Sequence, residues 1–357
     1  MLKSNRVTRL AVCLAIVATS IVAVPTSADA ARARSKTAAA RTTAAKAPAR
    51  STPRKKAYSA TSARARRAQL AKARAAAAAR TMREVQTPRF RVDEFGREVP
   101  DVRAEAAIIY NPTTGEVLWE SHAQDQRSQA SITKVMTALV FIDSGASMST
   151  PVTVERSDVS RASTTYLRNG FKLTADDLLN LLLVGSDNAA ARALARISPY
   201  GTEGFITKMN EKAAELGLIN TRYADPSGLL AENVSSAYDL ARLIAHASAD
   251  ERVGAIMRKQ TYTTQSGTQT ITARSTNQIV RNGDIDVVGG KTGFINRSGY
   301  CLATLLRLPS TGQQVAVVVL GAKSNASRFW ETRHLFNWMS TRTKALLDGD
   351  AQHQQDE

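Results

Sequence analysis

The chain has 357 residues, 43% of them hydrophobic, and a formal net charge of +17 at pH 7. Its four histidines are scattered, and none is spaced from another as metal ligands are, so a zinc peptidase has no support (His122, His246, His334 and His353). Residues 31–80 hold 15 Lys or Arg and no Asp or Glu, whereas residues 81–357 hold 30 basic and 30 acidic side chains. The basicity therefore belongs to one segment, and the remainder of the chain is neutral.

Residues 1–30 have the pattern of a signal peptide. Lys3, Arg6 and Arg9 precede an apolar run of about 15 residues, which Pro25 ends and Ala28-Asp29-Ala30 follows as a small-x-small cleavage site. A retained membrane anchor is the alternative, although the run is short for a bilayer span. We expect secretion across the inner membrane, cleavage before Ala31, and a periplasmic or cell-wall location.

Cleavage would leave Cys301 as the remaining cysteine, so an intramolecular disulfide is excluded. Cys301 lies in "GYCLATLL", an apolar stretch typical of a strand. We therefore expect it to be a buried small hydrophobe rather than a nucleophile.

Residues 31–82 form a basic tail of Ala, Arg, Lys, Ser, Thr and Pro that cannot bury a core. We expect it to be largely disordered, although its later alanine-rich part can form a helix when supported. Our hypothesis is that it binds anionic envelope polymers, and a solvated linker is the alternative. Behind a signal peptide, nucleic acid is not an expected partner. A connecting segment, 83–103, follows.

A folded domain is expected over 104–345, with a polar tail at 346–357. It begins with a hairpin at 104–121 and closes with an amphipathic helix at 327–347. Helices are predicted at 130–143, 174–184, 187–197, 202–216 and 235–248, and strands at 261–264, 270–276, 286–294, 298–308 and 313–322. The order predicts an α+β fold, with one antiparallel sheet built from both ends of the domain and a central helical block.

Ser131 and Lys134 lie at the start of the first of these helices, in "ASITKVMTALVF". The i,i+3 spacing places both side chains on one helix face, within hydrogen-bonding reach. A buried, neutral lysine could take the serine proton, and the helix N-terminus offers backbone N–H groups to a developing negative charge. By itself the pair would favour the simpler interpretation, a helix cap beside a lysine that reaches solvent.

Two further motifs favour the catalytic interpretation. Ser186-Asp187-Asn188 stands between two apolar helical runs, and Lys291-Thr292-Gly293 enters a strand. Their order after Ser131-x-x-Lys134 is typical of the penicillin-recognising serine acyltransferases. A serine-histidine triad has no support, because the chain has no histidine near a G-x-S-x-G turn.

On these motifs, together with "TRYADPSGLL", "VSSAYDLARLI" and "GGKTGFINRSGYCLA", the chain resembles the serine-type D-alanyl-D-alanine carboxypeptidases among the low-molecular-mass penicillin-binding proteins. It is most similar to their single-domain D-alanyl-D-alanine endopeptidase branch. The resemblance covers about 104–345 and implies a fold like that of β-lactamases and transpeptidases. It also implies peptidoglycan stem peptides as substrates, β-lactams as covalent inhibitors, and neither cofactor nor metal.

The resemblance also implies a role for each motif residue. Ser131 would form an acyl-enzyme on the penultimate D-alanine, with Lys134 as its base and Ser186 as proton relay. Asn188 would hold Lys134 and the substrate amide, and Gly293 would let the substrate backbone lie along the strand edge. Lys291 and Thr292 would bind the terminal carboxylate, and the backbone N–H groups of Ser131 and Phe294 would form the oxyanion hole. Lys291 would also help to keep Lys134 neutral, and Asp187 would cap a helix.

Three alternatives stay open. Cleavage of D-alanyl cross-links uses the same acylation chemistry as removal of the terminal D-alanine. A class A-like β-lactamase would need a deacylating glutamate, for which "ELGLIN" offers Glu215 in an imperfect setting. In a non-catalytic envelope-binding protein, the basic tail would be the functional part.

Overall fold

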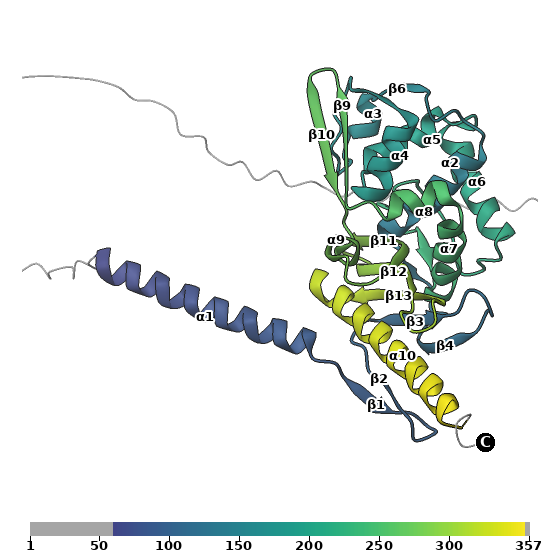
Figure 1. Cartoon of the computed structure of the whole chain (residues 1–357). Helices are drawn as coiled ribbons and strands as arrows, with labels where there is room; N and C mark the ends of the chain where they lie inside the picture. Colours follow the sequence, from purple (N-terminus) through teal and green to yellow (C-terminus); the bar gives the residue numbers. More distant parts are fainter. Residues whose placement is uncertain (1–59, 354–357) are drawn as a thin grey trace, which may run out of the picture. The chain divides into compact units, whose positions relative to one another are not determined.

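The computed structural model describes residues 60–353, and Figure 1 shows its elements along the chain. The signal-peptide prediction and the expected disorder of the first half of the basic tail lie outside the described residues. Within them, helix α1 spans Ala60–Gln86, so the alanine-rich half of the tail forms the helix its composition allows instead of being disordered. From residue 63 onward its side chains are exposed apart from the half-buried Val85.

A five-stranded antiparallel sheet organises the domain, in the order β11-β12-β13-β3-β4. Its strands are β3 (Ala106–Tyr110), β4 (Val117–Ser121), β11 (Val287–Ile295), β12 (Gly299–Arg307) and β13 (Gln314–Ala322). The first hairpin of the domain thus pairs with its last strand, as the predicted sheet from both chain ends requires. The α+β architecture is confirmed.

Alternating side chains of the sheet enter two separate hydrophobic cores. Ile108 belongs to the larger core beneath the helical block, and its neighbour Ile109 belongs to the smaller one. Figure 1 shows helix α7 on one face and helix α10 on the other. Their bounds are Ala237–Ala249 and Asn325–His353, so α10 continues into the expected polar tail.

The helical block contains the predicted helices close to their expected bounds. They are α2 (Thr133–Asp143, preceded by the 3-10 turn η1, Ala130–Ile132), α4 (Ala175–Val184), α5 (Asn188–Ile197) and α6 (Gly201–Glu215). Three short helices were not predicted: α3 (Arg156–Val159), α8 (Glu251–Met257) and α9 (Gln278–Asn282). Each is only one or two turns long, too short for a clear apolar period.

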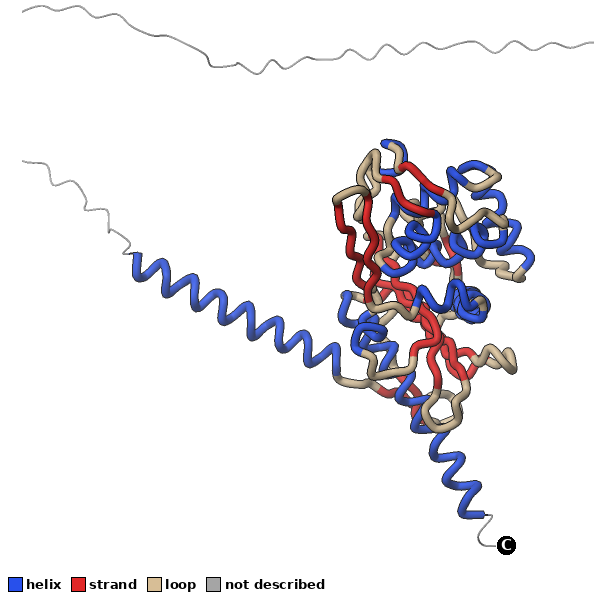
Figure 2. The backbone as a smooth tube through the Cα atoms, turned by 45° about the horizontal axis from the view of Figure 1, so that its top comes forward, coloured by secondary structure: helices blue, strands red, loops and turns tan. Residues whose placement is uncertain are grey.

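The predicted strands at 261–264 and 270–276 do not join the main sheet. They form a separate hairpin of β9 (Thr261–Ser266) and β10 (Gln269–Arg274), which stands beside the helical block in Figures 1 and 2. Most of its side chains are exposed, so its residues cannot fill a place inside a sheet covered on both faces.

Three further two-stranded ladders consist of strands of two or three residues, too short to predict. They are β1 (Phe90–Val92) with β2 (Glu98–Pro100), β5 (Arg127–Ser128) with β8 (Val234–Ser235), and β6 (Pro151–Thr153) with β7 (Lys172–Thr174). The β1-β2 ladder lies in the expected connecting segment 83–103. Over residues 60–353, no helix has both the length and the apolar character that crossing a membrane requires.

Candidate active site

Ser131 and Lys134 meet as their spacing predicts. Ser131 lies in η1, Lys134 lies in the first turn of α2, and the lysine Nζ is 3.0 Å from the serine Oγ. The lysine does not reach solvent, since its exposed fraction is 0%. Its Nζ also donates to Asn188 Oδ1 at 2.6 Å and to the carbonyl oxygen of Ser227. These contacts fix Nζ beside the hydroxyl it would deprotonate.

The surroundings of Lys134 lower the pKa of its ammonium from 10.5 to about 7. Burial is the largest cause, because a buried ammonium loses its hydration. The carboxylates of Asp225 and Asp187 act in the opposite direction, and the Arg192 guanidinium adds to the lowering. We expected Lys291 to be the cation that favours neutral Lys134. The charge of Lys134 lowers the pKa of Lys291, so the two ammoniums disfavour each other, and Arg192 is a further cation that acts on Lys134 in the same direction. Near neutral pH a large share of Lys134 is therefore a base.

The turn that presents Ser131 is held by a close main-chain contact. Ala130 has a φ of 50°, in the left-handed region. Gly228, with a φ of 78°, lies against it so closely that an added Cβ would be 2.0 Å from the Ala130 carbonyl oxygen. Only glycine fits this approach. Gly228 belongs to the "ADPSGLL" stretch, whose part in the site we did not predict.

The second motif lies between α4 and α5. Ser186 has a φ of 60°, and its Oγ accepts a hydrogen bond from Lys291 Nζ at 2.8 Å. Asp187 caps α5 by accepting from the backbone N–H of Ala190 at 2.9 Å, which confirms its expected role. Asn188 begins the helix and reaches Lys134. Adjacent residues of one turn thus contact both lysines.

The third motif lies on β11, the edge strand of the sheet. Lys291 is 1% exposed, and the pKa of its ammonium lies well below its usual value because of burial, with smaller contributions from Lys134 and Arg328. Thr292 Oγ1 is 2.6 Å from Thr276 Oγ1. Phe294 is 45% exposed and stacks on Tyr300, with ring centroids 4.2 Å apart.

Gly293 is the point where β11 approaches η1. An added Cβ at Gly293 would lie 2.6 Å from the carbonyl oxygen of Gln129, so a side chain would push the strand away from the nucleophile's turn. The opposite residue in the ladder is Cys301, whose thiol is buried with a raised pKa. The prediction that Cys301 is a buried hydrophobe is confirmed.

A cavity of about 500 Å³ opens over these residues. Ser131, Ser186, Asn188, Thr292, Gly293 and Phe294 line it, so the structure brings together the predicted site residues, with Lys134 and Lys291 buried below. The prediction missed seven lining residues: Ser163, Thr164, Leu229, Thr276, Ile295, Asn296 and Arg328. Ile295 and Asn296 directly follow the Lys-Thr-Gly motif, which was the available signal for them. The other five carry no motif.

Arg328, on α10, reaches the cavity from the far face of the sheet. Its guanidinium donates to the carbonyl oxygens of Gly293 at 3.0 Å and Cys301 at 3.2 Å. Burial lowers its pKa to about 10, so it is a cation at neutral pH. Burial favours the neutral form of Lys291. The Arg328 guanidinium is therefore the group beside Gly293 that stays positively charged and can attract a carboxylate. No cluster of three His, Cys, Asp or Glu side chains within residues 60–353 is placed to hold a metal ion.

Comparison with known proteins agrees with this geometry. The family model described as D-alanyl-D-alanine carboxypeptidase matches residues 93–324. The D-alanyl-D-alanine endopeptidase of Escherichia coli strain K12 is 32% identical over 68% of this chain and 79% of that protein. The D-alanyl-D-alanine endopeptidase of Haemophilus influenzae is 34% identical over 63% of this chain and 78% of that protein.

A carboxypeptidase and a solved structure are also similar. The D-alanyl-D-alanine carboxypeptidase DacF of Bacillus subtilis is 31% identical over 63% of this chain and 59% of that protein. The crystal structure of the Streptomyces K15 DD-transpeptidase superposes with a TM-score of 0.63 and 28% identity, covering 67% of this chain and 97% of that one.

Proposed function

This chain belongs to the D-alanyl-D-alanine carboxypeptidase family of serine-type, penicillin-binding hydrolases, and from this premise we propose how its residues act. The substrate is a peptidoglycan stem peptide that ends in D-alanyl-D-alanine, and the reaction releases the terminal D-alanine. The observation that carries the proposal is the 3.0 Å contact between Ser131 Oγ and the fully buried Nζ of Lys134. It supplies a nucleophile and its base in one turn.

Acylation begins when Ser131 Oγ attacks the carbonyl carbon of the penultimate D-alanine and its proton passes to neutral Lys134. The backbone N–H groups of Ser131 and Phe294 bind the oxyanion of the tetrahedral intermediate. As the C–N bond breaks, Ser186 relays the proton that Lys134 took from Ser131 to the departing D-alanine amine, which leaves Lys134 neutral again. Water then attacks the acyl-enzyme with Lys134 as its base, which releases the shortened peptide and restores Ser131.

Substrate binding uses the free edge of β11. An extended peptide can lie along this edge as an added strand, with Asn188 on its other side and Gly293 leaving room for its backbone. The terminal carboxylate is bound by Thr292 and by the positive charge of Arg328 and Lys291. Penicillin occupies the same cavity and leaves a stable acyl group on Ser131.

Endopeptidase action on D-alanyl cross-links is the second candidate. It is favoured by relatives named endopeptidases, of which this chain covers 79% and 78%, whereas it covers 59% of the Bacillus subtilis carboxypeptidase. Both activities share the acylation step. They differ in the size of the leaving group that fits beyond Thr292.

We expect the full chain to release free D-alanine from a stem pentapeptide faster than it converts cross-linked muropeptide dimers to monomers. The two products are measured by chromatography under identical conditions. The Ser131→Ala variant is the control for contaminating peptidases. Faster cleavage of the dimers would show that the protein acts mainly as an endopeptidase.

A β-lactamase is disfavoured by the position of Glu215. This side chain is exposed at the end of α6 and pairs with Lys212 at 3.0 Å. None of the residues that line the cavity is Asp or Glu. The acyl-enzyme therefore lacks the carboxylate that class A enzymes use to activate water for rapid deacylation.

The basic tail is proposed to hold the enzyme on anionic envelope polymers, with the periplasm or cell wall as its location. In the described part of the tail, α1 presents seven basic side chains and one acidic one to solvent (Arg64, Arg66, Arg67, Lys72, Arg74, Arg80, Arg83 and Glu84). Such a helix attracts polyanions through a charge interaction that salt screens.

We expect deletion of residues 31–82 to abolish cosedimentation with isolated sacculi at low salt, because the remaining chain is neutral. A matched variant replaces the seven basic residues of α1 by glutamine, which keeps helix propensity and removes the charge. It should bind more weakly, and added salt should release the wild-type chain. Binding that neither change nor salt affects would contradict this role.

A further inference from the structure

The loop between α3 and β7 forms one wall of the cavity, through Ser163 and Thr164. Two of its residues have backbone angles in the left-handed region, because Arg161 has a φ of 53° and Ser163 a φ of 59°. Residues other than glycine adopt such angles only where surrounding contacts hold them. The contacts that hold this loop therefore shape the cavity.

Residues at the start of α5 hold the middle and end of the loop. Asn188 Nδ2 donates to the carbonyl oxygen of Ala162 at 2.7 Å, and its backbone N–H donates to that of Thr164 at 3.0 Å. Asp187 accepts from the backbone N–H of Tyr166 at 2.6 Å. Asn188 also contacts Lys134, and the Asp187 carboxylate acts on its charge. The same two residues therefore hold the cavity wall and surround the catalytic lysine.

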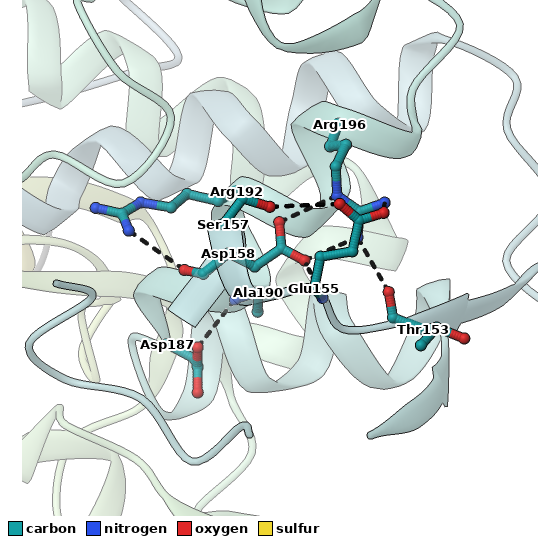
Figure 3. A network of polar contacts seen from close by, with 8 residues as sticks. All are labelled: Thr153, Glu155, Ser157, Asp158, Asp187, Ala190, Arg192 and Arg196. Atoms are coloured by element: carbon teal, nitrogen blue, oxygen red, sulfur yellow. Dashed lines mark hydrogen bonds and ion pairs between the residues drawn. The ribbon is translucent and has the colours of Figure 1, made fainter. Parts of the chain in front are cut away.

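Arg192, one helical turn after Asn188, holds the first residues of the loop. Its guanidinium donates to the carbonyl oxygen of Ser160 at 2.6 Å and to that of Asp158 at 3.3 Å. Figure 3 shows Arg192 reaching the main chain of Asp158, while Arg196 bonds the carboxylate of the same residue. Arg192 makes no ion pair with a carboxylate among the described residues, so its charge is not neutralised by contact.

We propose that Arg192 is a positioning residue for the reaction: it fastens the cavity wall to α5 and places a cation without an ion-pair partner in the group of charged side chains around the catalytic lysine. The inference rests on the proposed function, because the charge of Lys134 matters only if Lys134 is the base. Arg192 itself touches neither Ser131 nor the predicted substrate groups.

The charge balance around Lys134 supports this role. The ionisable groups that face it are Asp187 and Arg192 from α5, Asp225 from the loop before β8, and Lys291 from β11. The two carboxylates favour the ammonium, and Arg192 opposes them. Without Arg192, the carboxylates would raise the pKa of Lys134, and the lysine would lose its proton only at higher pH.

The test is the pH dependence of penicillin acylation in the full chain carrying Arg192→Gln, followed by intact mass from about pH 5.5 to 9.5. Glutamine keeps an amide donor for the Ser160 carbonyl and removes the charge. We expect the midpoint to rise by about half to one pH unit. Acylation should be about three- to tenfold slower at pH 6 and within about twofold of wild type at pH 9.

Arg192→Lys is the conservative variant. It keeps the charge but cannot bond both carbonyls with a planar fork, so we expect the wild-type midpoint with a lower plateau. If Arg192→Gln does not fold, Arg192→Lys tests the proposal by itself. A raised pH midpoint of acylation in Arg192→Lys, which retains the positive charge, would overturn the proposal.

Arg196→Gln is the matched control on the same helix. It removes a charge that pairs with Asp158 and Glu155 rather than facing Lys134, so the unfolding temperature should fall while the midpoint stays. An unmoved midpoint in Arg192→Gln, or equal shifts in both variants, would overturn the inference while leaving the proposed function intact. Failure of the wild-type chain to form an adduct at any pH would overturn both.

Discussion

Ser131→Ala is expected to abolish the covalent penicillin adduct and to reduce D-alanine release by at least about 10⁴-fold. The hydroxyl is the only part of the side chain removed, and Lys134 and the cavity remain. Intact mass of the full chain after incubation with penicillin measures the adduct directly. Wild type should gain one drug molecule, and the variant none.

Ser163→Ala is the matched control, since Ser163 also lines the cavity but has no lysine contact in the described structure. It should retain the adduct. An undiminished adduct in Ser131→Ala would identify another nucleophile, with Ser186 the first to test. A short-lived adduct accompanied by hydrolysed drug in the wild-type chain would instead indicate a β-lactamase.

Lys134→Met should lower the acylation rate by about 10² to 10⁴-fold, because methionine fills a similar buried volume and removes the base. In wild type, acylation should increase with pH through a midpoint near 7, since the pKa of Lys134 is about 7 and only its neutral form accepts the serine proton. The variant should lose this dependence. Stopped reactions analysed by intact mass across the pH range measure both effects.

Lys259→Met is a suitable control because this lysine is also in a hydrogen bond, with Asn180 Oδ1 at 2.7 Å, but does not line the cavity. It should keep the wild-type rate and midpoint. A Lys134→Met variant that still follows the wild-type pH profile would assign the base to another group, of which Lys291 is the nearest candidate by its lowered pKa.

The parts of the site that depend on local geometry were predictable from the sequence. Ser131 and Lys134 face each other because helix geometry fixes the i,i+3 relation, and Asp187 caps α5 because short acidic side chains favour that position. The apolar stretches of β11, β12 and β13 likewise predicted the strands of the sheet. In each case the information lies within one element or its boundary.

Residues that reach the site through tertiary packing were not predictable. Arg328 belongs to a helix that the sequence predicts only as an amphipathic cover for the sheet. The packing of α10 against β12 and β13 brings its guanidinium within reach of the Gly293 carbonyl on β11. Thr276 lies in a loop and is recognisable only by its contact with Thr292. Gly228 could be identified as a turn glycine, but not as the partner of Ala130.

Hairpin β9-β10 illustrates the same limit in the fold. Its alternation predicted strands, and strands are what forms, but alternation does not specify the partner of a strand. The exposed faces of β9 and β10 are compatible with an independent ribbon, whereas the nearly continuous apolar run of β13 requires cover on both faces.

The pairing of β3 with β13 means that the active site forms only when segments from both ends of the domain have come together. Ala107 lies opposite Val319, so the first strand of the sheet waits for one of the last segments to be made. Ordering so long a loop is slow, and until then β3 and β4 expose an unpaired edge to other chains. A chain that already carries Ser131 and Ser186 still lacks the strand that bears Lys291. Covalent labelling by penicillin should therefore report completed folding of the domain.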